Sequence, residues 1–176
     1  MKKEIEVKVL NIDPAKLRKN LKKMGAVRVF PPTLFREIYW ESPAKERIYS
    51  SFRLRLEGKK SFLTLKIKKE DRHFEVRDEF EVAVGDFSMA LKILELAGFK
   101  IFREREKRRE EYQIGTIKVE IDEYPKMRPY MEIEASSKKD ALTFLKQLGF
   151  PLKYTTNRTA TEVIQDAGLD PNRLLF

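Results

Sequence analysis

The chain has no cysteine and a single histidine, His73. Without thiols it can form neither disulfides nor thiolate metal sites, and one imidazole cannot complete a zinc site. His73 lies beside a predicted hairpin turn, where we expect it to be solvated. Any bound metal is therefore expected to have oxygen ligands, which favours hard cations such as Mg2+ or Mn2+.

Long apolar runs are also missing. No segment approaches the roughly 20 apolar residues of a membrane span, and the N-terminus lacks the apolar core of a signal peptide. We therefore expect a cytoplasmic protein with no membrane partner. The 176 residues fit one domain, and no linker or low-complexity segment divides them. The expected organisation is one domain over residues 1–176.

Charge is the feature in excess. Charged residues make up 37% of the chain, against roughly 25% in an average soluble protein. A charge-rich chain that is poor in Gln and Asn suits a thermophile, in which surface ion-pair networks are common. The net charge of +9 predicts attraction to polyanions, which include nucleic acid, phosphorylated metabolites and anionic membranes. Charge alone does not choose among them.

Apolar and charged residues alternate along much of the chain with the period of two that is typical of half-buried strands. The alternation is clearest over residues 4–9, 52–56, 63–68, 74–82, 117–122 and 131–135, and it is weaker over 36–40 and 100–112. Short turns separate several of these segments. The pattern predicts an antiparallel meander of about eight strands.

Three other segments have helical spacing, each beginning at a capping residue and ending at a glycine. They are Asp13–Gly25, Asp86–Gly98 and Ser137–Gly149, and a shorter fourth helix is expected over Thr161–Ala167. The recurrence of strands, helix and glycine predicts two similar halves.

The placement of the helices decides where the charges lie. Helices with one apolar stripe must cover the apolar faces of the strands, which leaves the charged faces together on the other side. An open sheet with one wet face is the ordinary alternative. We favour closure because about eight antiparallel strands can curl into a barrel without free edges. The predicted fold class is α+β, a closed eight-stranded antiparallel β-barrel, or tunnel, with helices packed on the outside.

Residues two apart share a strand face, and like charges recur at that spacing. The acidic pairs are Glu4 and Glu6, Glu79 and Glu81, Glu120 and Asp122, and Glu132 and Glu134; the basic pairs are Arg53 and Arg55, Lys66 and Lys68, and Lys107 and Arg109. Lys8 shares the face of Glu6, and Arg77 that of Glu79. One such pair is common by chance and fits a solvated strand edge. Sorted clusters of both signs suit a triphosphate bound with divalent cations.

The first of these strands, Glu4-Ile5-Glu6-Val7-Lys8, resembles the E-x-E-x-K signature of the CYTH superfamily. This superfamily, the triphosphate tunnel metalloenzymes, includes class IV adenylate cyclases, thiamine triphosphatases and inorganic triphosphatases. Later segments resemble its other motifs in order: Phe52–Leu56 the R-x-R strand, Leu65–Lys68 the lysine strand, Arg77–Glu81 the R-x-E-x-E strand, Lys107–Arg109 the K-x-R element, Val119–Asp122 the aspartate strand and Met131–Glu134 the closing E-x-E.

The resemblance implies a role for each matching residue. It implies a metal site of Glu4, Glu6, Glu132 and Glu134 with Asp122, and a triphosphate site of Lys8, Arg53, Arg55, Lys66, Lys68, Arg77, Lys107 and Arg109. Glu79, Glu81 and Glu120 would support these groups, either as metal ligands or by orienting the bases. Lys8, Lys66 and Tyr39 are the catalytic candidates, with Tyr39 and Lys66 as a pair that activates water.

The chain departs from the family pattern at three places. Arg158 is followed by Thr159-Ala160, where the cyclase branch often has Ser-Tyr, and this weakens a cyclase assignment. Glu37 replaces an aspartate that often precedes the tyrosine of the second strand. Residues 125–130 lack the glycines common in relatives, which is expected to alter the tunnel mouth. Trp40 is expected to fill the core instead of stacking on a base.

These observations favour a metal-dependent triphosphatase that hydrolyses a nucleoside, inorganic or organic triphosphate. The first alternative is a class IV-type adenylate cyclase, which makes cyclic AMP and pyrophosphate from ATP. It comes second because hydrolysis needs no adenine pocket. The second alternative is a non-catalytic binder of polyphosphate or RNA. The expected partner is a small-molecule triphosphate and not a nucleic acid, because the basic run 103–109 follows the lumen pattern. A homodimer is compatible with the sequence.

Overall fold

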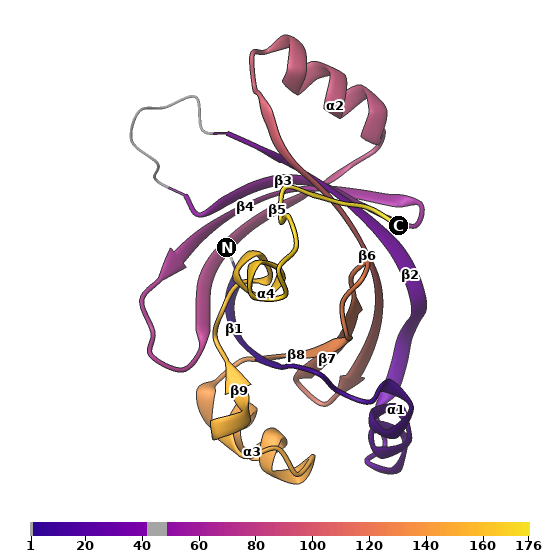
Figure 1. Ribbon diagram of the computed structural model, residues 1–176, viewed down its shortest axis with the longest axis vertical. Helices are drawn as coiled ribbons and strands as arrows, with labels where there is room; N and C mark the ends of the chain where they lie inside the picture. The colour runs from indigo at the N-terminus through magenta and orange to yellow at the C-terminus, as the bar shows by residue number, and fades with distance from the viewer. Residues whose placement is uncertain (1, 42–48) are drawn as a thin grey trace.

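The computed structural model describes residues 2–41 and 49–176, with the backbone alone for residues 2–4. Eight antiparallel strands form a ring, as Figure 1 shows. They are β1 (Lys2–Val9), β2 (Val27–Trp40), β3 (Ser51–Glu57), β4 (Lys60–Lys69), β5 (Glu75–Val84), β6 (Ile101–Ile114), β7 (Ile117–Glu123) and β8 (Tyr130–Ala135).

The ring is closed by hydrogen bonds between neighbouring strands. Its order is β6, β2, β3, β4, β5, β1, β8 and β7, and a further pairing of β6 with β7 completes the circle. The short strand β9 (Thr155–Thr156) adds to β1, and β10 (Arg173–Leu174) runs parallel to β6. The predicted closed barrel is confirmed.

Strand β2 begins earlier than the expected residue 36. Pro31 and Pro32 cannot donate a ladder hydrogen bond, and in a sequence they argue against a strand. Here they fall within the irregular part of the β2–β6 ladder, where the register shifts between Arg28 and Phe30 and again between Phe30 and Thr33. Such bulges let a strand continue through prolines. The expected start was therefore wrong.

Two helices cover the outer wall formed by β1, β7 and β8. Helix α1 (Pro14–Lys23) begins where the Asp13 carboxylate accepts the N–H groups of Ala15 and Lys16, and α3 (Lys138–Gln147) begins at the Ser137 hydroxyl. Their apolar stripes join the strand residues in one core. Fully buried members of this core include Val7, Leu21, Val119, Ile133 and Leu145.

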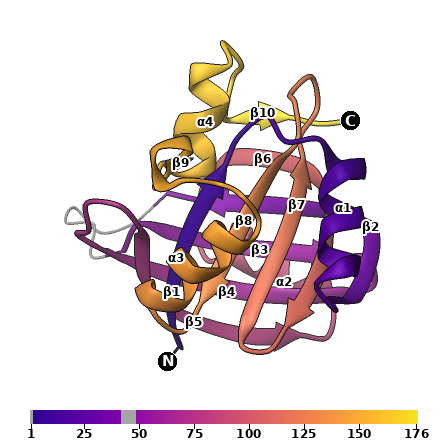
Figure 2. The same ribbon diagram turned by 90° about the horizontal axis from the view of Figure 1, so that it is seen from below.

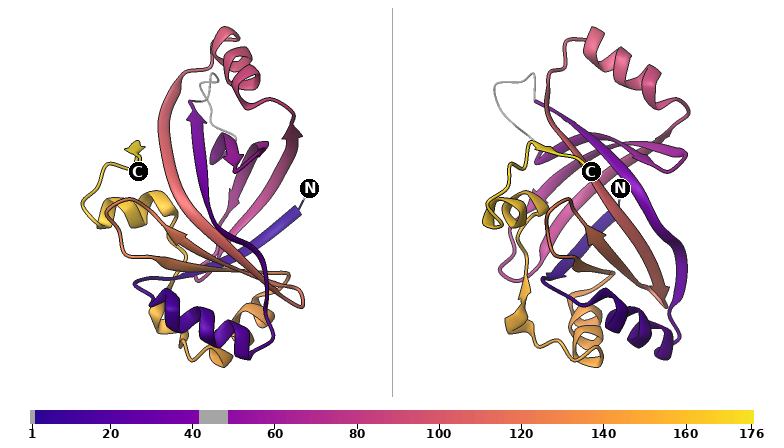
Figure 3. Two further views of the ribbon diagram at one scale, coloured as in Figure 1. Left: turned by 90° about the vertical axis from the view of Figure 1, so that its right-hand side faces the viewer. Right: turned by 45° about the vertical axis from the view of Figure 1, so that its right-hand side comes forward.

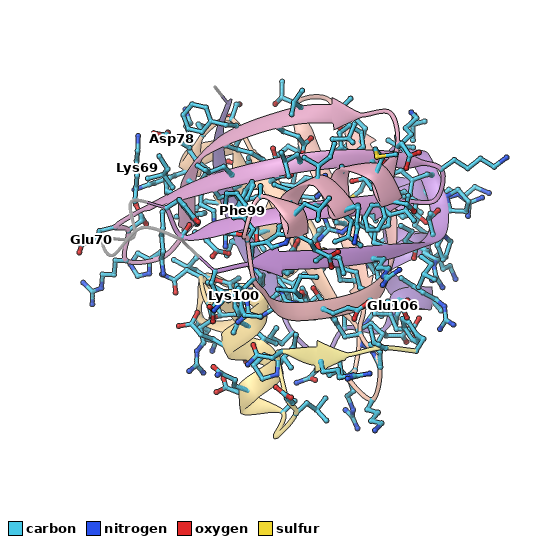
Figure 4. The ribbon with its side chains drawn as sticks, turned by 90° about the horizontal axis from the view of Figure 1, so that it is seen from above. Lys69, Glu70, Asp78, Phe99, Lys100 and Glu106 are labelled. Atoms are coloured by element: carbon cyan, nitrogen blue, oxygen red, sulfur yellow. The ribbon has the colours of Figure 1, made fainter. Side chains whose placement is uncertain are left out.

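Helix α2 (Phe87–Leu96) covers the opposite wall and lies at the other end of the molecule from α1 and α3 (Figure 1). It packs beside Ile38, Trp40 and Leu54 on β2 and β3. Trp40 is completely buried here, as expected. No residue of α2 itself is fully buried. In Figure 4, α2 crosses in front of the strands, with Phe99 close to its end.

The last helix, α4 (Ala160–Asp166), lies at one end of the barrel with β9 and β10 (Figure 2). A capping box between Thr159 and Glu162 starts it, and a short 3-10 helix (Leu152–Tyr154) precedes it. Val163 and Ile164 pack near Tyr124 and Tyr130. Among the described residues, no helix is long and apolar enough to cross a membrane.

Candidate functional site

The barrel encloses a cavity of about 680 Å3 lined by side chains from all eight strands. Alternate residues of a strand point to opposite faces, so the apolar set packs under the helices and the charged set faces the lumen. Fifteen predicted residues line the cavity: Glu6, Lys8, Tyr39, Arg53, Arg55, Lys66, Lys68, Arg77, Glu79, Glu81, Lys107, Arg109, Glu120, Glu132 and Glu134.

Two predicted residues are placed otherwise. The side chain of Glu4 lies outside the described residues, although its backbone pairs with Arg77 in the β1–β5 ladder. Asp122 is fully buried and stands behind the cavity surface.

One cluster surrounds Lys8, whose ammonium group is almost completely buried. Its Nζ lies 2.7 Å from Glu75 Oε2 and 3.4 Å from Glu132 Oε1, and it also donates to Glu6. Burial and then the charge of Glu132 raise the pKa of Glu6 to about 7. Burial alone would lower the pKa of Lys8, but the carboxylates outweigh it and raise that pKa. Arg77 also donates to Glu75 and lies 3.8 Å from Glu6, and Arg109 donates to Glu132 at 2.6 Å, so three cations share these three carboxylates.

A second cluster surrounds Arg109. Its Nε lies 2.6 Å from Asp122 Oδ1, and its terminal nitrogens lie 2.5 Å from Glu120 and 2.6 Å from Glu132. Asp122 Oδ2 also accepts from Lys107 Nζ at 2.9 Å. Both Asp122 oxygens are thus engaged by cations, which places this side chain as an anchor for two basic residues.

A third cluster occupies the wall formed by β2, β3 and β6. Glu37 accepts from Arg53 at 2.7 Å and from the Tyr39 hydroxyl at 2.9 Å, and Arg105 donates to that hydroxyl at 2.8 Å. Burial alone would raise the pKa of Glu37, but Lys107, Arg53 and Arg105 hold it well below its usual range. Burial alone would also raise the pKa of Tyr39, but Arg105 and Arg53 together lower it.

In the third cluster, two hydrogen-bond donors have no acceptor within the described residues. Within the described part of the chain, Nε of Arg53 and Nε of Arg105 are buried without an acceptor. A buried N–H without a partner costs roughly 1–3 kcal/mol, so an anion that accepts from these groups would be stabilised. Lys66 Nζ lies 3.4 Å from Glu79 Oε1. The pairing of Tyr39 with Lys66 stays a prediction.

Acidic and basic side chains line the cavity in nearly equal numbers. Without a ligand they largely neutralise one another, so most of the chain's net charge of +9 lies elsewhere. A triphosphate brings several negative charges into this balanced lumen, and the low dielectric of a buried site makes uncompensated charge costly. Accompanying cations would remove that cost.

A divalent metal ion requires several oxygen ligands around one point. Within residues 5–41 and 49–176, no three acidic or histidine side chains form a ready-made metal site. The lumen carboxylates are drawn to bases instead, as when Glu134 pairs with Lys118. Their chemistry nevertheless fits a hard divalent cation, since the donors are all carboxylate oxygens. His73 is exposed at a turn, as expected.

Several lumen residues were missed or left without a role by the sequence patterns. They include Glu37, Glu75, Arg105, Lys118 and Tyr124. The four charged residues continue the alternation of a recognised strand by one step: Glu75 precedes Arg77 by two positions, and Lys118 precedes Glu120 in the same way. Extending every charged face to the end of its strand would have found these four, whereas Tyr124 lies just beyond the end of β7.

Glu37→Gln is expected to destabilise the fold by roughly 2 kcal/mol or more at pH 7, because it removes the charge that Arg53 and Tyr39 contact. A carboxylate with a lowered pKa in the fold stabilises it above its ordinary pKa of 4.5 and loses that contribution as the pH falls below it. The loss of unfolding free energy caused by Glu37→Gln should therefore become smaller between pH 4.5 and pH 3. Urea unfolding at several pH values, with the exposed Glu41→Gln as reference, measures this. A cost that is constant with pH would contradict the charge network.

The chain is similar in sequence to known proteins. The family model described as the CYTH domain matches residues 2–160. A Methanocaldococcus jannaschii protein named "putative adenylate cyclase" is 29% identical over 135 residues, which cover 76% of this chain and 77% of that protein.

Solved structures share the fold. A conserved hypothetical protein from Pyrococcus furiosus superposes with a TM-score of 0.76 and 25% identity, covering 92% of this chain and 99% of that one. A Hippeastrum protein described as a "putative adenylyl cyclase" with a dominant triphosphatase activity has a TM-score of 0.65 and 16% identity, covering 96% and 97%.

Proposed function

The chain belongs to the CYTH domain family, and on that premise we propose that it hydrolyses a triphosphate inside the barrel with the help of a divalent metal ion. The observation that carries the proposal is the enclosed cavity in which the carboxylates around Lys8 share a lumen with the basic side chains of β3, β4 and β6. One group suits a cation and the other suits phosphate oxygens.

The metal is assigned to the carboxylates of Glu6, Glu132 and Glu134, with Glu4 on the same strand as Glu6. Strand pairing supports the assignment, because Glu6 faces Glu134 and Lys8 faces Glu132 in the β1–β8 ladder. When bound, Mg2+ or Mn2+ polarises phosphate oxygens and offsets the charge that develops on the leaving group. Asp122 is assigned to the orientation of Lys107 and Arg109.

The phosphate chain is assigned to the basic walls. Arginine suits bidentate contact with phosphate oxygens, and lysine supplies point charge. The assigned residues are Lys8, Arg53, Arg55, Lys66, Lys68, Arg77, Lys107 and Arg109, and Arg105 joins them because its Nε is buried without an acceptor in the described structure. Glu79, Glu81 and Glu120 orient these bases. Tyr39 and Lys66 are the candidates for handling the proton of the attacking water.

Adenylate cyclase is the second candidate, and the name of the M. jannaschii relative favours it. Cyclisation uses the same grip on the phosphates but also requires the ribose 3′-hydroxyl to be held against the α-phosphate. The Hippeastrum protein, whose description carries both activities, supports testing the two together. Hydrolysis stays first because the lining is dominated by charged side chains.

Product analysis separates these functions. The protein is incubated with ATP, inorganic triphosphate and thiamine triphosphate, each with Mg2+, with Mn2+ or with a chelator. Phosphate, pyrophosphate and cyclic AMP are then measured separately. We expect metal-dependent release of phosphate from at least one substrate. Cyclic AMP as the main product would reverse the order of the two enzymes, and metal-independent binding without turnover would leave only the polyanion binder.

A further inference from the structure

Helix α2 presents an apolar stripe to solvent. Met89, Ile93 and Leu96 are exposed by 58%, 59% and 76%. Spacings of four and three residues place them on one helix face. Together they expose on the order of 300 Å2 of apolar surface, which reaches the size at which exposed patches are often functional.

Folding of the barrel does not account for this stripe. Phe87, Ala90, Leu91 and Leu94 are the α2 residues that pack toward β2 and β3. At about 100° per residue the exposed stripe lies on the opposite side of the helix. Both panels of Figure 3 show α2 at the far end of the molecule from α1 and α3. Within the described residues, the stripe therefore faces away from the barrel wall that α2 covers.

The order of residues along the stripe is self-complementary. In an antiparallel pair of α2 helices related by a two-fold axis near Ile93, Met89 of one copy faces Leu96 of the other. The two Ile93 side chains then meet at the axis. Lys92 and Glu95 are exposed and lie on the same flank of the stripe. A two-fold axis perpendicular to the helices brings Lys92 of each copy opposite Glu95 of the other.

We propose that α2 is a homodimerisation helix, with a second copy of this chain packed antiparallel on the Met89–Ile93–Leu96 stripe and two Lys92–Glu95 ion pairs at its edge. An isologous contact requires one patch to complement itself, and this patch does so in both its apolar order and its charges. The proposal does not rest on the proposed function. The stripe is smaller than the roughly 800 Å2 per partner of a standard interface, so the dimer should dissociate on dilution.

Cross-linking tests the two-fold axis. The chain has no cysteine, so Ile93→Cys introduces a single thiol at the position where the two copies meet. A disulfide requires Cβ atoms roughly 4 Å apart. Under mild oxidation we expect Ile93→Cys to form a covalent dimer. The matched control is Val27→Cys, whose site is 68% exposed and lies at the start of β2. Absence of the cross-link, or equal cross-linking of both variants, would overturn the proposal.

Charge reversal tests the orientation. Lys92→Glu and Glu95→Lys each place like charges opposite one another in the antiparallel pair, so each variant alone should sediment as a monomer at concentrations at which the wild type dimerises. An equimolar mixture of the two variants should restore the dimer, because every pair across the axis is then of opposite sign. A wild type that is monomeric at every concentration, or single variants that dimerise like it, would contradict the proposal.

Discussion

Glu6→Gln is expected to lower metal-dependent turnover of a triphosphate about 100-fold or more, while the barrel stays nearly as stable as in the wild type. The loss follows from removing one carboxylate of the proposed metal site. The fold tolerates the change because Lys8 keeps Glu75 at 2.7 Å and Glu132 at 3.4 Å. Burial also disfavours the charge of Glu6, whose pKa is raised to about 7. Steady-state kinetics and urea unfolding measure the two effects.

The matched control is Glu123→Gln. Glu123 is exposed at the end of β7 and lies 3.9 Å from an exposed Arg108, so its loss should change neither quantity. Full activity of Glu6→Gln would remove Glu6 from the metal site. Equal losses of activity and stability would show that Glu6 is structural.

Asp122→Ala is expected to lower the free energy of unfolding by about 3–5 kcal/mol, because it takes from buried Lys107 the carboxylate that it contacts and from Arg109 one of its three carboxylates. Asp122 has no exposed surface and contacts Arg109 at 2.6 Å and Lys107 at 2.9 Å. Turnover should fall as well, since both bases lose their orientation. Chemical denaturation of the two proteins checks the stability, and circular dichroism checks that the variant folds.

A salt bridge on the barrel exterior supplies the control. Lys69 and Asp78 lie beside one another at the edge of the molecule in Figure 4, with 2.7 Å between Nζ and Oδ2, and Lys69 is half exposed. Asp78→Ala should cost at most about 1 kcal/mol. If Asp122→Ala and Asp78→Ala lower the free energy of unfolding equally, Asp122 does not anchor Lys107 and Arg109.

Much of the lumen could be predicted because the strand period is simple. Glu6 and Lys8 lie two residues apart and therefore share one face of their strand. The apolar stripes of α1 and α3 must pack on the opposite, apolar face. The same reasoning carried to each strand end would have added Glu75 and Lys118. Closure was predicted because about eight antiparallel strands can curl into a barrel without free edges, and the β6–β7 pairing confirms it.

The partners of each charge could not be predicted, because they depend on register between strands. Arg109 faces Asp122 because the turn between β6 and β7 sets that register, with Gly115 at a φ of +55°. Nothing local in the sequence states which base a carboxylate will meet. The sequence predicts Asp122 as a supporting metal ligand, and its contacts with Lys107 and Arg109 become visible only once the register is known.

The extent to which each helix is buried against the barrel could not be predicted from the sequence either. The segment of α2 has the same capping and apolar spacing as α1 and α3, yet it buries none of its residues fully. An amphipathic pattern shows which face is apolar and does not show how much surface lies beneath it. The second stripe of α2 is visible only when the first has been placed on the barrel.

Calorimetric titration with a triphosphate whose bridging oxygens are replaced by methylene groups tests the central claim, that the charged lumen takes its anion together with a divalent cation. The account predicts one site per chain in the presence of Mn2+ and an affinity at least about 100-fold weaker with chelator, since the lumen charges already balance. Equal affinity without the metal, reduced only by added salt, would contradict it.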